Sequence, residues 1–232
     1  MSAADLVASV RAELAPGAHE NRLVIAVAQG VAPVSAIGAL AAEETRIVVS
    51  DRRAMLLLAA RATDPSAVDF FSRLAEGEGL VLPLLPALAR AAGLSEQDLR
   101  GYQVRPGCQA YAGYVAWLAV NGDPVEVILA LLANFAAWGG YCATLARALR
   151  IHYGFDDAAC AFVDFFATSA EPPPPPEPAA GVAVGVDPLE AAALAAIGRR
   201  LAEGDTLAGG REYGRLLQSY ELMFWNTLAD AG

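Results

Sequence analysis

The chain carries no charged residue between Val127 and Ala146, and this run is the feature that most constrains its fold. A helix that is apolar on every side has to be buried, either in the core of a bundle or in a membrane. Pro124 follows the turn Asn121-Gly122-Asp123 and suits the first position of a helix. A second apolar segment precedes that turn, so residues 106–150 predict a helical hairpin.

Two environments are open for this hairpin, because the uncharged run is long enough to cross a membrane. Asn134, the Gly139-Gly140 pair and the high alanine content favour the core of a bundle instead. With 232 residues, 56% of them hydrophobic, the chain can bury a sizeable core. We therefore predict a single all-α domain over residues 1–232, a multi-helix bundle around a buried central hairpin.

Further helices are predicted on both sides of the hairpin from helical periodicity and from the positions of proline and glycine. A kink or restart is expected at Pro83 and Pro86, and Ser95 is expected to cap a short helix. A Pro-rich surface loop is predicted at about residues 171–187, as an extended linker or, alternatively, a ligand for a proline-binding domain. The other predicted helices span Ser2 to Leu14, Asn21 to Gly30, Val34 to about Ala62, Ala67 to Glu76 and on through Arg90, Ala158 to Thr168, Pro188 to Ala202 and Arg211 to Ala229, with a loop at 152–157.

Charge and composition exclude several functions. The formal net charge of −10 argues against a nucleic-acid surface. All 16 basic residues are arginine, so no lysine can form a Schiff base. His19 and His152 are the only histidines, too few for a di-iron site. We expect no metal and no cofactor. Three cysteines without paired spacing, and no evident signal peptide, predict a reducing compartment, the cytoplasm.

Within the uncharged run a few polar and aromatic side chains share one helical face. Asn134, Trp138 and Tyr141 lie within a narrow arc, which is the candidate wall of a pocket. A mid-helix asparagine must be hydrogen-bonded, either to a ligand or to another helix as a structural link, and both alternatives stay open. In the helix from Val34, Glu44 shares a face with Asp51, whereas Glu43 is expected to form a surface ion pair with Arg46.

Three segments carry recognisable motifs: residues 106–114 read Pro-x-x-x-Ala-Tyr-x-x-Tyr at a helix start, residues 130–138 lie in the helix that follows, and residues 219–226 read Ser-Tyr-Glu-Leu-Met-Phe-Trp-Asn. These segments resemble the two corresponding helices and the terminal signature of the TenA or thiaminase-II family, an all-helical group with the haem-oxygenase-like fold. The resemblance implies that Glu221 is a catalytic carboxylate and that Glu44 stands where an aspartate binds the amino group of an aminopyrimidine. An exposed glutamate is the alternative interpretation of Glu44.

The same resemblance implies a pocket that binds substrate, and it also shows where this chain departs from the family. Asn134 stands where the family has its nucleophilic cysteine, and Trp138 stands where it has a tyrosine. Thr45 and Ala159 likewise replace aromatic residues. The substrate-binding residues expected from the arc and the resemblance together are Tyr111, Asn134, Trp138, Tyr114, Tyr141 and Cys108.

The expected function is that of a small-molecule enzyme acting on a heterocyclic or aromatic metabolite. Carboxylate acid–base catalysis by Glu221 and Glu44 would replace the cysteine mechanism, and thiaminase activity itself is not expected. The alternative is a non-catalytic small-molecule-binding or protein-interaction module that keeps the cavity. The expected partners are a small-molecule ligand and further copies of the chain, in a dimer or tetramer, with neither nucleic acid nor membrane.

Overall fold

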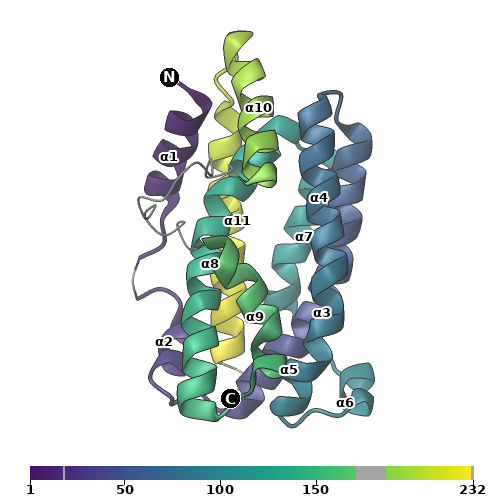
Figure 1. The fold of residues 1–232 in the computed structure, drawn as a ribbon, viewed down its shortest axis with the longest axis vertical. Coiled ribbons are helices and arrows are strands. Elements are labelled where there is room, and N and C mark those ends of the chain that lie inside the picture. The colour runs from purple at the N-terminus through teal and green to yellow at the C-terminus, as the bar shows by residue number, and fades with distance from the viewer. Residues whose placement is uncertain (18, 171–186, 231–232) are drawn as a thin grey trace, which may run out of the picture.

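The structure is a computed structural model that describes residues 1–17, 19–170 and 187–230, and every regular element among these residues is helical (Figure 1). The prediction of an all-α fold is confirmed. The elements are α1 (Ala3–Leu14), α2 (Arg22–Ala28), α3 (Val34–Arg61), α4 (Pro65–Val81), the 3₁₀ turn η1 (Leu82–Leu84), α5 (Leu85–Ala91), α6 (Glu96–Gly101), α7 (Pro106–Asn121), α8 (Pro124–Tyr153), α9 (Asp157–Ala170), α10 (Pro188–Ala202) and α11 (Ala208–Ala229).

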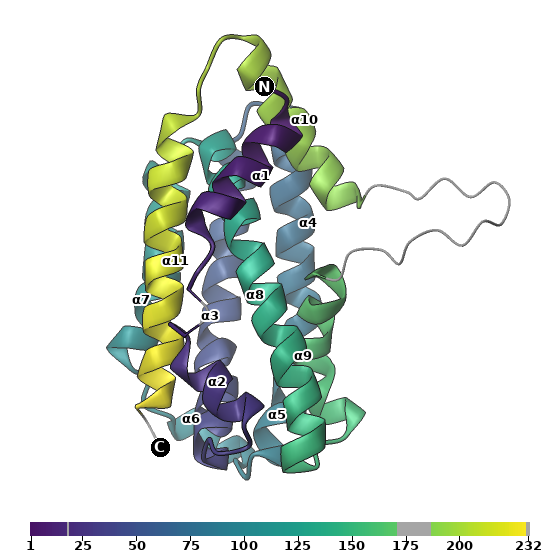
Figure 2. The same cartoon turned by 90° about the vertical axis from the view of Figure 1, so that its left-hand side faces the viewer.

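The predicted hairpin of α7 and α8 lies inside the bundle. Figure 1 shows α3 and α4 as an antiparallel pair on one side, with α7 packed against both α3 and α11. Figure 2 shows α11 running beside α8, with α1 lying across the upper part of both. Because α8 contacts α1, α2, α9, α10 and α11, its apolar surface is covered by other helices.

By length and composition alone α8 could cross a membrane. In the structure, 56% of its most hydrophobic stretch is buried against the rest of the bundle. Burial of this kind is what the central helix of a bundle shows, and it agrees with the prediction of a buried central helix.

Local signals in the sequence set the helix ends. The Ser95 hydroxyl caps α6 in a reciprocal pair with Asp98, as expected. The expected break occurs at Pro83 and Pro86: α4 ends before Pro83, which lies in η1, and α5 begins beside Pro86. The loop predicted at 152–157 is shorter than expected: residues 152–153 belong to α8, which is capped by Gly154 in the left-handed conformation (φ 68°), and α9 already begins at Asp157. The predicted Pro-rich loop lies outside the described residues except for Asp187, which caps α10.

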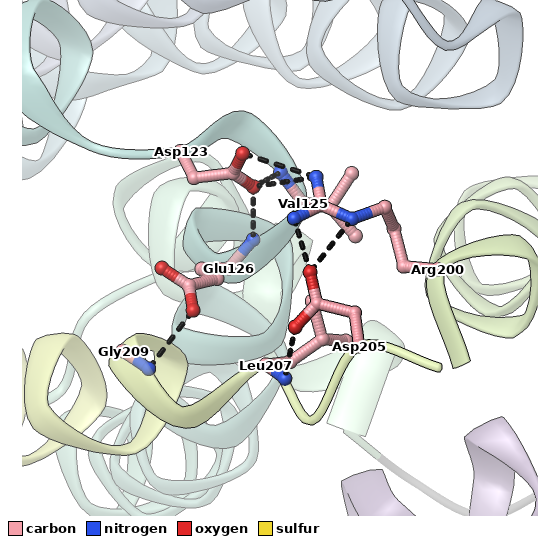
Figure 3. Close-up of polar contacts among 7 residues, drawn as sticks. All are labelled: Asp123, Val125, Glu126, Arg200, Asp205, Leu207 and Gly209. Atoms are coloured by element: carbon pink, nitrogen blue, oxygen red, sulfur yellow. Dashed lines mark hydrogen bonds and ion pairs between the residues drawn. The ribbon is translucent and has the colours of Figure 1, made fainter. Parts of the chain in front are cut away.

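A polar junction fixes the start of α11 against the start of α8 (Figure 3). Asp123 caps α8 and also accepts from Arg200 Nη1 at 3.0 Å. The same guanidinium bonds Asp205, whose other oxygen accepts from the Leu207 amide at 2.9 Å. Glu126 Oε1 accepts from the amide of Gly209, also at 2.9 Å. The loop between α10 and α11 is thereby tied to the first turn of α8.

Gly210, the residue after Gly209, lets α11 approach α8 closely. A Cβ on Gly210 would lie 2.9 Å from Leu129 Cδ2 and 3.0 Å from the backbone oxygen of Glu126. Any larger residue would push α11 away from α8. The contact therefore helps to set the register that later brings Glu221 of α11 opposite Asn134 of α8.

Glu43 does not form the predicted surface ion pair with Arg46. Its side chain is fully buried and accepts hydrogen bonds from Gln109 Nε2 (2.6 Å), the Arg105 backbone amide (2.8 Å) and the Tyr102 hydroxyl (3.1 Å). Arg46 is exposed. The prediction was wrong because the segment before α7 packs over the Glu43 face, which helical spacing within α3 alone cannot show.

Candidate active site

Glu221 lies at the centre of a buried polar network on α11. Its side chain is 1% exposed, and its Oε1 accepts from the Trp225 indole Nε1 at 3.1 Å. Its Oε2 accepts from the Asn134 amide nitrogen of α8. The same Asn134 nitrogen donates to Gln218 Oε1 at 3.3 Å. Two of the residues predicted from the sequence, Glu221 and Asn134, are therefore in direct contact.

The environment of Glu221 adjusts its acidity. Burial raises the pKa of its carboxyl from 4.5 to about 7, and the hydrogen bonds from Trp225 and Asn134 limit the rise because they favour the charged form. A carboxyl group with a pKa near neutrality can both take up and release a proton at physiological pH. This is the property that acid–base catalysis requires.

Three further carboxyl groups, from α3 and α4, lie around this network, and we call them together with Glu221 the acidic cluster. Burial, followed by the nearby Asp51, Glu78 and Glu221, raises the pKa of Glu44 well above its ordinary value. Burial raises the pKa of Asp51 to about 7, and burial with the charge of Asp51 raises the pKa of Glu78 well above 4.5. None of the four forms an ion pair with an arginine in the described part of the chain.

Tyr111 of α7 faces the acidic cluster. Burial and the charges of Asp51, Glu221, Glu78 and Glu44 hold the pKa of its hydroxyl well above 10. The ring packs against both hydrophobic cores of the bundle, one built around α2, α5 and α9 and the other around α1, α4 and α10. Tyr111 is therefore a protonated hydrogen-bond donor at the boundary between the two cores.

Aromatic rings from α8 form one side of the network. Trp138 packs on Trp225 with ring centroids 5.2 Å apart, and Tyr141 meets the same indole edge-on at 5.8 Å. The Tyr141 hydroxyl is buried close to Glu221 and to Asn21, without a well-formed hydrogen bond. Burial first, and then the nearby Glu221, raise its pKa to about 12. Trp138 and Tyr141 thus lie on the face of α8 predicted from the sequence.

The cysteines near the network are poor nucleophiles. Cys142 is fully buried, and burial together with the charges of Glu44 and Glu221 raises the pKa of its thiol well above 9. Burial raises the pKa of the Cys108 thiol to about 12, and its sulfur lies 3.9 Å from the carbonyl oxygen of Phe224. Both thiols remain protonated at neutral pH, whereas the thiolate is the reactive form.

Tyr114 points away from the acidic cluster, although it was predicted to bind substrate. Its ring packs against Tyr220 at 5.1 Å and Trp117 at 5.9 Å, in a surface groove of about 470 Å³ between α7 and α11. Positions 111 and 114 differ by about 60° around a helix, so the two side chains point in different directions. A second groove, of about 680 Å³, lies on the outer face of α3 and is lined by Arg46 and other residues, not by Glu44.

Four residues of this region were not predicted as part of a site. Asp51 is seven positions after Glu44 on the same helical face, and that spacing could have revealed it. Gln218 and Trp225 each lie about one turn from Glu221, so they could also have been found by spacing. Glu78 belongs to another helix, and no signal in the sequence connects it with the other carboxyl groups.

The fold places the chain among the haem-oxygenase-like helical bundles. A solved domain of unknown function with this fold, from Shewanella denitrificans, superimposes with a TM-score of 0.61 at 13% identity, covering 99% of this chain and 88% of that one. The chain belongs to the TENA/THI-4/PQQC family, whose model matches residues 16–164. The matched stretch contains Glu44, Tyr111 and Asn134, and it ends before α11.

Solved TenA homologues share the same architecture. The homologue from Pyrococcus horikoshii has 15% identity and a TM-score of 0.67, with 100% of both chains covered. The homologue from Pyrococcus furiosus has 16% identity and a TM-score of 0.67, covering 99% of this chain and 100% of that one. No curated protein matches the sequence significantly. At such identities the superpositions establish the fold, while the family model establishes membership.

Proposed function

We propose that this chain is a small-molecule enzyme that binds a heterocyclic or aromatic metabolite at the acidic cluster and uses Glu221 as a general acid and base. The observation that carries the proposal is Glu221 itself, a buried carboxyl held between Trp225 and Asn134 with a pKa of about 7. Membership of the TenA-containing family supports a role in small-molecule chemistry.

The surrounding residues suggest how a substrate would be held. Glu44 can accept from a basic or amino nitrogen, and the protonated hydroxyl of Tyr111 can donate to a ring acceptor. Trp138 supplies an aromatic surface beside Glu221. The reaction would be a proton transfer or the hydrolysis of a C–N bond in which Glu221 activates a water molecule, because the neighbouring thiols are protonated.

Turnover by purified protein tests the proposal. The wild type is incubated with a panel of aminopyrimidines and other amine-bearing heteroaromatic compounds, and products are followed by liquid chromatography and mass spectrometry. Glu221→Gln keeps the shape of the side chain but removes its proton exchange, so we expect a loss of at least about 100-fold in kcat. Glu212→Gln, an exposed position on the same helix, is the matched control and should leave turnover unchanged. Equal turnover by Glu221→Gln and wild type would refute the catalytic role.

The second candidate function is a binding module without turnover. The observation that favours it is Asn134, which the resemblance aligns with the family's nucleophile and which bonds Gln218 as well as Glu221. A ligand retained through purification and detected by native mass spectrometry, with no product from any compound of the panel, would support this alternative over the enzyme.

A further inference from the structure

The groove of about 680 Å³ on the outer face of α3 is a second candidate site, and we call it the α3 groove. Residues of α3, α6 and α7 line it, and α3 packs beside α7 (Figure 1). Arg46, Ser50, Arg53 and Leu57 follow one another by three or four positions, so they form one stripe of α3 along the groove. Small-molecule sites typically occupy about 300–1,000 Å³, and the α3 groove falls within that range.

The walls of the α3 groove are largely apolar. Val49 and Leu57 come from α3, and Ala116 and Val120 come from α7. Leu57 is 40% exposed and Val120 is 60% exposed, although both line a concave surface. A ligand with an apolar part that covers these side chains would remove them from water, which is favourable.

The charged residues of the α3 groove are all basic. Arg46, Arg53 and Arg100 line it, and no acidic residue does, in a chain whose formal net charge is −10. Within the described ranges neither Arg46 nor Arg53 forms an ion pair. Arg100 pairs only with the exposed Glu96, at 3.4 Å, and an exposed pair of this kind contributes little. The α3 groove is therefore complementary to an anion.

Charge also separates the possible occupants. A symmetric contact between two copies through this groove would place the arginines of one copy against those of the other, which is unfavourable. A nucleic acid needs a wide basic surface, which the net charge of −10 opposes, and it has no use for apolar walls. A small anion with an apolar body satisfies both the arginines and the walls.

We propose that the α3 groove binds a small organic anion with an apolar body, its anionic group between Arg46 and Arg53 and its body against Leu57 and Val120. The two arginines are seven residues apart, about 10.5 Å along the helix axis, and Ser50 lies between them. Two guanidinium groups and a hydroxyl can all donate to a carboxylate placed there, in charge-assisted hydrogen bonds. This site is independent of the acid–base chemistry proposed for Glu221.

Binding of simple carboxylates tests the site without knowledge of the natural ligand. Octanoate, octan-1-ol, acetate and octylammonium are titrated into the protein, and binding is followed by NMR chemical shifts. Octanoate carries both features, so we expect it to bind at least about tenfold more tightly than each of the others. The variant Arg46→Gln/Arg53→Gln should lose at least about tenfold in octanoate affinity. The matched control is Arg147→Gln/Arg215→Gln, which changes the net charge equally at exposed positions outside the groove and should bind as the wild type does.

The other outcomes decide against the proposal. Equal affinity for octanoate and octan-1-ol, or an octanoate affinity that Arg46→Gln/Arg53→Gln retains, would overturn it. An equal loss in the control variant would show an effect of net charge alone. Binding to vesicles of anionic phospholipid but not to dissolved octanoate would assign the groove to a membrane surface. No octanoate binding, with a changed oligomeric state of Arg46→Gln/Arg53→Gln in sedimentation, would assign it to a second copy.

A further variant keeps this test separate from the proposed function. Glu221→Gln should bind octanoate as the wild type does, because Glu221 does not line the α3 groove. A loss of octanoate affinity in Glu221→Gln would place the anion elsewhere and refute the α3 groove as its site. Failure of octanoate to bind would leave the catalytic role of Glu221 untouched.

Discussion

Replacing Glu221 by glutamine should stabilise the protein at alkaline pH and have little effect at acid pH. Burial raises the pKa of Glu221 from 4.5 to about 7 in the folded state. The folded protein therefore binds this proton more tightly than the unfolded chain does. Stability must fall as pH rises from about 4.5 to about 7, and the loss is complete above that range. Glutamine has no ionised form and escapes this loss.

The magnitude follows from proton linkage. With pKa values of 4.5 unfolded and about 7 folded, ionisation of Glu221 costs about 3.3 kcal/mol at pH 8 and about 0.8 kcal/mol at pH 5. The stability difference between Glu221→Gln and wild type should therefore grow by about 2.5 kcal/mol in favour of the variant between these pH values. Any constant cost of rearranging the bonds to Asn134 and Trp225 cancels in this comparison.

Urea unfolding of both proteins at pH 5, 6, 7 and 8, followed by circular dichroism, measures the difference directly. Asp51 and the other carboxyl groups titrate in both proteins, so the comparison isolates Glu221 together with its effect on its neighbours. A stability difference that is constant across these pH values, or that grows in favour of the wild type, would refute the assignment of a buried carboxyl with a raised pKa.

Three further outcomes are expected. Glu43→Ala should lower the free energy of unfolding by about 3 kcal/mol in urea melts, since it leaves three partly buried donors unsatisfied; the exposed Arg46→Ala should change it by less than about 0.5 kcal/mol, and equal effects would contradict the buried position of Glu43. Asn134→Cys should not gain aminopyrimidine hydrolysis, because a thiol beside Glu221 would stay protonated as Cys142 does; product release detected by mass spectrometry would show otherwise. Ellman's reagent should label none of the three buried cysteines in native protein and all of them in urea, and prompt native labelling would disprove their burial.

Much of the fold could be predicted from local sequence. The uncharged run in α8 had to be buried, and the prolines and capping residues set helix ends that the structure confirms, as at Ser95 and Pro124. Within the candidate site, the spacing of Asn134, Trp138 and Tyr141 placed them on one face of α8. The resemblance of residues 219–226 to a known signature pointed to Glu221 as a candidate catalytic carboxylate. These features depend on neighbours a few residues apart, which a sequence displays directly.

Tertiary packing alone decided which charged residues became part of the interior. Glu43 and Glu44 are adjacent in sequence, yet one is enclosed by donors from the start of α7 and the other joins the acidic cluster. Glu78 reaches the cluster only because α4 packs antiparallel to α3, and Tyr114 leaves it because its ring packs against Tyr220 of α11. The sequence by itself determined the helices and their buried faces, since helix formation and amphipathicity are local. Only the tertiary structure decided which buried faces meet, because burial and charge interactions depend on helices distant along the chain.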